Sequence, residues 1–178
     1  MRTLAITALA CLTLVLQSAL WRYLPFELAA PDMWALFAVY LGLHAATEGG
    51  APVAGLAALI IGLNQDVLAG APTGLFGFSA VAIAMVAALL SKHLLLRGRV
   101  AIGGTGMTAS LLGALFVLGL LGAEGAALRP GLSLVAVIVV QAFMTALAAV
   151  PLFPLLRRVE ARTSRQRARD LSREGLLR

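Results

Sequence analysis

Six long apolar runs constrain this chain more than any other feature of its sequence. They cover about residues 3–21, 32–47, 51–69, 74–91, 101–122 and 131–156, and most charged residues lie between or after them. A helix needs about 20 apolar residues to cross the hydrocarbon core of a bilayer, whereas a barrel strand needs ~10 residues of alternating character. The runs therefore predict an all-α, polytopic bundle of six transmembrane helices, in which every backbone amide bonds within its own segment.

The composition points to the same class of protein. Of the 178 residues, 61% are hydrophobic and 12% are charged. Soluble domains carry about 25% charged residues, and disordered chains have low hydrophobicity. An ordinary soluble domain and a disordered chain are therefore both excluded. We expect a six-helix transmembrane domain over residues 1–156 and a basic tail over residues 157–178.

The basic residues predict the orientation of the bundle. Placing both termini in the cytoplasm leaves only Arg22 and Arg129 of the 14 basic residues outside. This distribution follows the positive-inside rule. The arginine-rich tail directly follows the last apolar run, which favours contact with anionic lipid or a cytoplasmic partner over nucleic-acid binding. The candidate contacts there are Arg157, Arg158, Arg162 and Arg165.

The first run is expected to stay in the mature protein as a transmembrane helix. It begins after a single arginine and therefore resembles a signal peptide, but no polar cleavage region follows it. The single cysteine, Cys11, lies inside this run and cannot form an internal disulfide.

Small residues form two stripes at helical spacing. One consists of Gly55, Ala58 and Gly62, and the other of Gly106, Ala109 and Gly113. Small residues allow helix backbones to approach closely in a membrane. The stripes therefore predict helix packing inside the bundle, with docking of a partner's transmembrane helix as the alternative.

The most distinctive segment joins the third and fourth runs, at residues 62–77. Three polar residues interrupt the apolar run, and a turn rich in glycine follows them. The polar residues are Asn64, Gln65 and Asp66, and the turn contains Gly70, Pro72 and Gly74. A carboxylate inside the membrane is costly, so it is expected to face protein, water or a partner. Either Asp66 ties down the turn by accepting backbone N–H bonds, or it binds a partner or ligand.

The remaining polar residues suggest no catalytic grouping, cofactor or metal site. His44 and Glu48 are one helical turn apart and can pair, and the two histidines and one cysteine are scattered over three segments. Asp32 is expected to place a favourable charge at the start of the second helix. Gln141 is expected to hydrogen-bond between helices. No nucleotide-binding loop or Ser/His/Asp grouping is found in the sequence.

Residues 40–88 resemble the rod shape-determining protein MreD family. The resemblance rests on Tyr40-Leu-Gly-Leu, on Gly55 at the opening of the third helix, and on Gly62-Leu-Asn-Gln-Asp-Val-Leu-Ala-Gly-Ala-Pro-Thr-Gly-Leu-Phe. It covers roughly a quarter of the chain. The first, fifth and sixth helices match the family only in hydropathy, and the arginine tail lies outside its pattern.

The resemblance implies a scaffold of the cell-elongation complex, in the inner membrane of a bacterium, with no enzymatic activity of its own. The implied partners are the bitopic protein MreC, the actin-like MreB, the glycosyltransferase RodA and a class B penicillin-binding transpeptidase. Such a complex supports cell shape through side-wall peptidoglycan synthesis.

The resemblance also implies a fold similar to that of the substrate-binding S-components of vitamin transporters. A small-molecule uptake subunit is therefore the alternative function. Its distinguishing feature would be several polar or aromatic residues that converge on one pocket.

Overall fold

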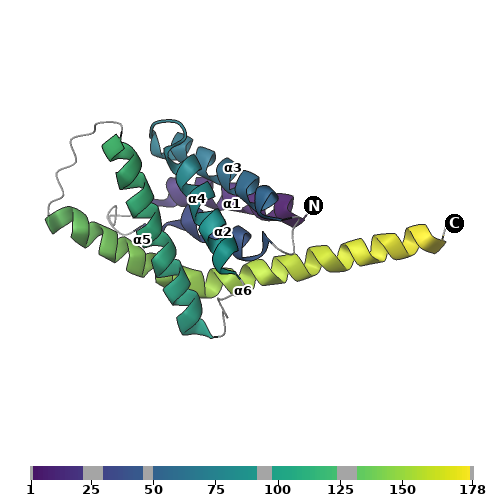
Figure 1. The fold of residues 1–178 in the computed structure, drawn as a ribbon. Helices are drawn as coiled ribbons and strands as arrows, with labels where there is room; N and C mark the ends of the chain where they lie inside the picture. Colours follow the sequence, from purple (N-terminus) through teal and green to yellow (C-terminus); the bar gives the residue numbers. More distant parts are fainter. Residues whose placement is uncertain (1, 22–29, 46–49, 92–97, 124–131, 177–178) are drawn as a thin grey trace.

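The computed structural model describes residues 2–21, 30–45, 50–91, 98–123 and 132–176, and their regular structure consists of six α-helices. The helices are α1 (Arg2–Trp21), α2 (Met33–Leu43), α3 (Ala51–Ala69), α4 (Leu75–Leu90), α5 (Arg99–Ala123) and α6 (Leu132–Leu176) (Figure 1). The all-helical prediction is therefore confirmed for the described part of the chain.

Four of these helices, α1, α3, α5 and α6, are long and apolar enough to cross a membrane. The fold is thus that of a helical membrane protein. The two shorter apolar helices, Met33–Leu43 and Leu75–Leu90, fall below the length of a full span. At 1.5 Å per residue, the 11 residues of α2 are roughly 16 Å long, against ~30 Å for the hydrocarbon core.

The second helix is shorter than the run from 32 to 47 predicts, and it lies at the centre of the bundle. Its nine residues from Trp34 to Gly42 are all buried. A helix that is apolar on every side is one that other helices cover completely. Its neighbours include α4, α3, α5 and α1, so α2 forms the core around which the longer helices pack.

Glycines allow the closest helix contacts of this bundle. A Cβ atom added to Gly42 would lie 2.2 Å from the Ala84 carbonyl oxygen of α4. One added to Gly106 would lie 2.7 Å from the Ala149 Cβ atom of α6. Both distances are too short for a real Cβ, so the α2–α4 and α5–α6 pairs depend on the absence of a side chain.

The third and fourth helices begin and end where the sequence predicts them to. Pro52 lies in the first turn of α3, and Gly70 ends the helix with a left-handed backbone at φ 62°. Gly74, at φ 99°, precedes α4. The two helices therefore form a hairpin around the turn at residues 70–74.

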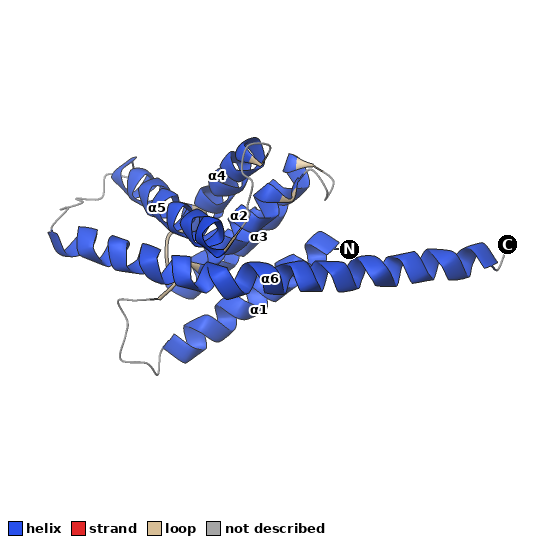
Figure 2. Ribbon diagram, turned by 90° about the horizontal axis from the view of Figure 1, so that it is seen from below, coloured by secondary structure: helices blue, strands red, loops and turns tan. Residues whose placement is uncertain are grey.

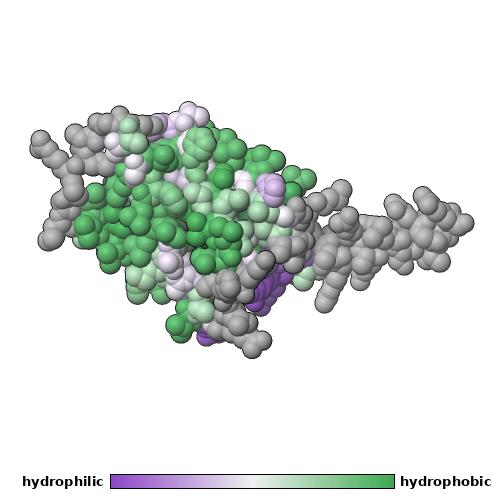
Figure 3. Space-filling view, viewed as in Figure 1, coloured by the Kyte–Doolittle hydropathy of each residue, from purple (hydrophilic) through white to green (hydrophobic). Residues whose placement is uncertain are grey.

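The sixth helix continues well beyond the bundle. It runs without interruption through Pro151 and Pro154 to Leu176, and its last part projects away from the other helices (Figures 1 and 2). The start of α1 and the point where α6 leaves the bundle lie at the same end of the molecule (Figures 1 and 2). The face of the bundle seen in Figure 3 is largely apolar, and hydrophilic residues gather where α6 leaves the bundle.

Candidate functional site

Asp66 closes the turn between α3 and α4. Its side chain is 2% exposed, and its two carboxylate oxygens accept hydrogen bonds from the backbone N–H groups of Gly74 at 2.8 Å and Phe76 at 2.7 Å. Its own carbonyl oxygen accepts from Ala71 N–H at 3.0 Å. The carboxylate thus satisfies two N–H groups at the start of α4, where a helix favours negative charge. This geometry agrees with the first of the two roles expected for Asp66, in which its carboxylate stabilises the turn by accepting backbone N–H bonds.

The other polar residues of this segment lie around the turn. Asn64 and Gln65 are half-buried, and Gly70 and Pro72 are exposed. The Asn64 Nδ2 atom is buried and has no hydrogen-bond partner among the described residues. A buried amide donor without a partner is costly, so Asn64 is the residue of this segment with free capacity to bind.

The two small-residue stripes are buried. All six residues, Gly55, Ala58 and Gly62 on α3 and Gly106, Ala109 and Gly113 on α5, lie inside the bundle. A Cβ atom on Gly62 would lie 2.4 Å from the Phe76 carbonyl oxygen of α4. One on Gly113 would lie 3.0 Å from the indole ring of Trp34.

Asp32 forms a second polar site that the sequence did not reveal. It precedes α2, but its carboxylate makes no capping bond to that helix. Instead, the Ser110 hydroxyl of α5 donates to one oxygen, and the Gln141 amide of α6 donates to the other at 2.6 Å. The side chain of Trp34 is a third hydrogen-bond partner.

The backbone of Asp32 is also held by α6. Its N–H donates to the Thr145 hydroxyl at 2.9 Å, and that hydroxyl donates to the Gln141 carbonyl at 2.7 Å. Asp32 therefore joins the start of α2 to both α5 and α6. The expectation of a simple charge at the helix terminus was incomplete, whereas the expected hydrogen bond of Gln141 between helices is present.

A pocket of about 200 Å³ opens beside the Asp32 carboxylate. Its walls come from the start of α2 and from α4, α5 and α6. The residues that line it include Asp32, Trp34, Phe76, Gly113, Ile138 and Gln141. The rings of Trp34 and Phe76 meet edge to face, with centroids 5.3 Å apart. The pocket thus combines one carboxylate with an aromatic and aliphatic lining.

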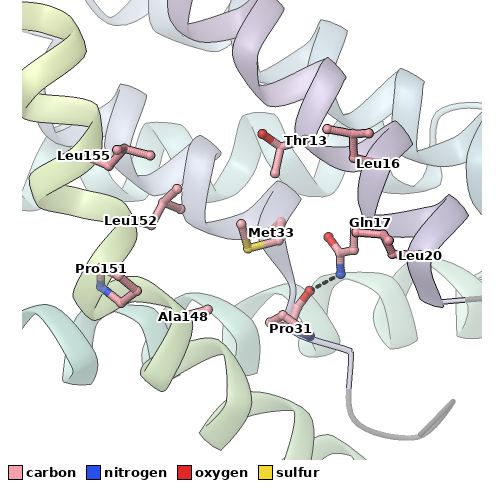
Figure 4. Close-up of a pocket in the computed structure, with 10 residues that line it drawn as sticks. All are labelled: Thr13, Leu16, Gln17, Leu20, Pro31, Met33, Ala148, Pro151, Leu152 and Leu155. Carbon is pink, nitrogen blue, oxygen red and sulfur yellow. Dashed lines mark hydrogen bonds between the residues drawn. The ribbon is translucent and has the colours of Figure 1, made fainter. Parts of the chain in front are cut away.

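A larger apolar groove of about 470 Å³ separates α1 from α6. Figure 4 shows Leu16, Gln17 and Leu20 of α1 facing Pro151, Leu152 and Leu155 of α6, with Met33 between the two helices. The Gln17 amide donates to the Pro31 carbonyl at 2.7 Å. Its Oε1 atom is buried without a partner in the described part of the chain, and it points toward the groove (Figure 4).

The other predicted residues stay apart from these sites. The Nδ1 atom of His44 lies 2.9 Å from the Tyr40 carbonyl oxygen, and its ring stacks on that of Tyr40. Glu48, its expected partner, lies outside the described residues. The described residues contain no group of three or more side chains that could hold a metal ion.

The basic residues of the tail are only partly described. Arg157 and Arg158 are exposed on α6, where it leaves the bundle. The side chains of Arg162 and Arg165 lie outside the described part of the structure.

Comparison of the chain with models of known protein families, with curated proteins and with solved structures finds no match in any of the three.

Proposed function

We propose that this protein is a non-catalytic scaffold of the bacterial cell-elongation complex that binds a single-pass membrane protein of the MreC kind. In this proposal it crosses the inner membrane six times, with both termini in the cytoplasm. MreB, RodA and a class B penicillin-binding transpeptidase belong to the same complex. The MreD-like segment at residues 62–77 suggests this assignment.

The observation that carries the proposal is the groove between α1 and α6. Its walls are leucines, prolines and a methionine, which suit the apolar surface of a transmembrane helix. The Gln17 side chain lines the groove, and its buried Oε1 atom has no hydrogen-bond partner among the described residues. A buried acceptor without a donor costs about 1–3 kcal/mol, and a hydroxyl or amide on an incoming helix would recover that cost.

Pro151 lines the groove and removes one helical hydrogen bond from α6. Pro151 has no N–H, so the Leu147 carbonyl cannot receive the usual helical bond from residue 151. Asn64 offers an unpartnered donor at the turn between α3 and α4. A partner helix in the groove with a polar segment over this turn would bring hydrogen-bonding groups toward Gln17 and Asn64, whose buried side-chain atoms have no partner among the described residues.

Site-specific photo-crosslinking tests the docking surface. A photoreactive residue is placed at Leu16 or Leu155 in the groove, and the chain is co-expressed with a tagged MreC-type protein. Matched control positions are Leu115 on α5 and Phe78 on α4, which are 66% and 68% exposed but lie outside the groove.

We expect a crosslinked heterodimer from the two groove positions and none from the controls. Equal crosslinking at all four positions would contradict the docking surface. Recovery of no MreC-type protein in pull-downs from mild detergent, together with unchanged cell shape on depletion, would contradict the scaffold function itself.

A second candidate function is a binding subunit of a small-molecule uptake system. The feature that distinguishes it is a pocket on which polar and aromatic residues converge, and the pocket beside Asp32 has this character. Such a subunit would depend on an energising ATPase. Ligand-dependent accumulation in cells, lost when the chain is deleted, would favour this function over the scaffold.

A further inference from the structure

We propose that the pocket beside Asp32 binds a compact organic cation, an ammonium group attached to a small apolar body. The pocket would bind such a cation in a scaffold and in an uptake subunit alike, because neither function determines the chemistry of this site.

Among the described residues, only neutral groups contact the Asp32 carboxyl group. Ser110, Gln141 and Trp34 each donate a hydrogen bond to it. No lysine, arginine or histidine among the described residues forms an ion pair with it. A carboxylate offers about four acceptor sites, so three donors leave room for one more N–H group. A group that brings both a donor and a positive charge complements this site best.

The lining of the pocket selects an ammonium ion rather than a metal ion. Calcium takes six to eight oxygen ligands and magnesium takes six, whereas Asp32 is the one carboxylate among the described residues that line this space. Trp34 and Phe76 place aromatic rings beside the carboxylate. Aromatic rings attract organic cations, and Trp does so most strongly.

The size of the pocket limits the ligand. About 200 Å³ is below the ~300–1,000 Å³ of sites for drug-sized molecules. Gly113 allows the indole of Trp34 to sit at the wall, because a Cβ atom there would lie 3.0 Å from the ring. Ile138 adds an aliphatic surface. One small ring or a short branched chain beside the ammonium group fits these dimensions.

Binding is measured on the full chain in detergent or nanodiscs. The probes are benzylamine and cyclohexylamine, with benzyl alcohol and cyclohexanol as neutral controls of similar shape and benzoate as an anionic control. The W21F variant leaves Trp34 as the single tryptophan, so its fluorescence reports on the pocket. Thermal unfolding provides a second, independent readout.

We expect saturable quenching of Trp34 fluorescence by both amines, with at least tenfold tighter binding than by the alcohols. The D32N variant should weaken amine binding at least tenfold. The D170N variant, which changes a carboxylate in the projecting part of α6, should bind amines as the unmodified chain does. The A114F variant fills the pocket while keeping Asp32, and it should abolish binding.

Four arginines, Arg22, Arg97, Arg129 and Arg178, lie outside the described residues. Arg22 and Arg129 are the two on the non-cytoplasmic side in the proposed orientation, so an R22Q/R129Q variant is measured as well. Equal binding of amines and alcohols would overturn the proposal, and so would the absence of saturable amine binding in both the unmodified chain and this variant. Unchanged affinity in a folded D32N protein would also overturn it. If D32N does not fold, A114F replaces it in the test, and unchanged affinity of A114F for the amines would overturn the proposal.

Discussion

Gly74 donates its backbone N–H to the carboxylate of Asp66 at 2.8 Å, and this bond closes the chain between α3 and α4. The same carboxylate also accepts from Phe76, so a single side chain holds the start of one helix against the end of another. The turn between α3 and α4 is therefore held as a fixed hairpin corner. A partner that binds there meets a preformed surface.

Replacing Asp66 with asparagine should destabilise this corner. The asparagine amide keeps one acceptor oxygen, but its NH2 group is a donor. It would face the N–H of Gly74 or Phe76, which would then lose its acceptor. We expect a loss of about 1.5–3 kcal/mol, the usual range for hydrogen bonds to a charged group. Thermal unfolding in detergent measures the change, and E124Q is the control. D66N should also recover less partner than E124Q in pull-downs, and equal values for the two variants would show that the charge is dispensable.

Adding a methyl group at Gly62 should separate α3 from α4. The new Cβ atom would lie 2.4 Å from the Phe76 carbonyl oxygen, which belongs to the backbone and cannot rotate away. We expect G62A to destabilise the protein by ~1–3 kcal/mol, as overpacking does elsewhere. Gly104 is the matched control, because a Cβ atom added there would meet nothing within 4 Å. Similar stability of G62A and G104A would contradict the close approach of the two helices.

Reporter fusions should place the two ends of α4 on opposite sides of the membrane. A phosphatase reporter fused after residue 70 should be active, because that enzyme folds only after export. One fused after residue 98 should be inactive, and a fluorescent reporter should give the opposite pattern. These outcomes follow from the positive-inside rule applied to the basic residues between α4 and α5. The reverse pattern would invert the proposed orientation.

The arginines at the start of the projecting part of α6 should retain anionic lipid. Each basic residue near an anionic surface contributes about 1 kcal/mol of attraction. Changing Arg157, Arg158, Arg162 and Arg165 together to glutamine should lower the phosphatidylglycerol that co-purifies with the protein, as measured by mass spectrometry. The matching change to lysine preserves charge and should preserve lipid. Equal lipid content in the glutamine and lysine variants would refute the interaction.

Residues close together in the sequence were enough to predict where α3 begins and ends, but they did not predict the site around Asp32. Pro52 and Gly70 bracket α3, and both act through their own backbone, so the sequence suffices to place that helix. The carboxylate of Asp32 instead depends on Ser110 and Gln141, which are 78 and 109 residues away. Only the packing of α5 and α6 around α2 brings them together. The burial of α2 on every side likewise follows from tertiary structure, because its sequence reads equally well as a spanning helix.

The bond from Asp32 to Thr145 spans 113 residues, and this separation matters while the chain is being made. When α1 to α5 have left the ribosome, Gln141 and Thr145 have not yet been inserted. Until then the Asp32 carboxylate has Ser110 of α5 as a donor but lacks Gln141, and the Asp32 backbone N–H lacks the Thr145 hydroxyl. Insertion of α6 supplies Gln141 and Thr145 together. A chain that stops before α6 therefore lacks two of the hydrogen bonds that hold Asp32 at the start of α2.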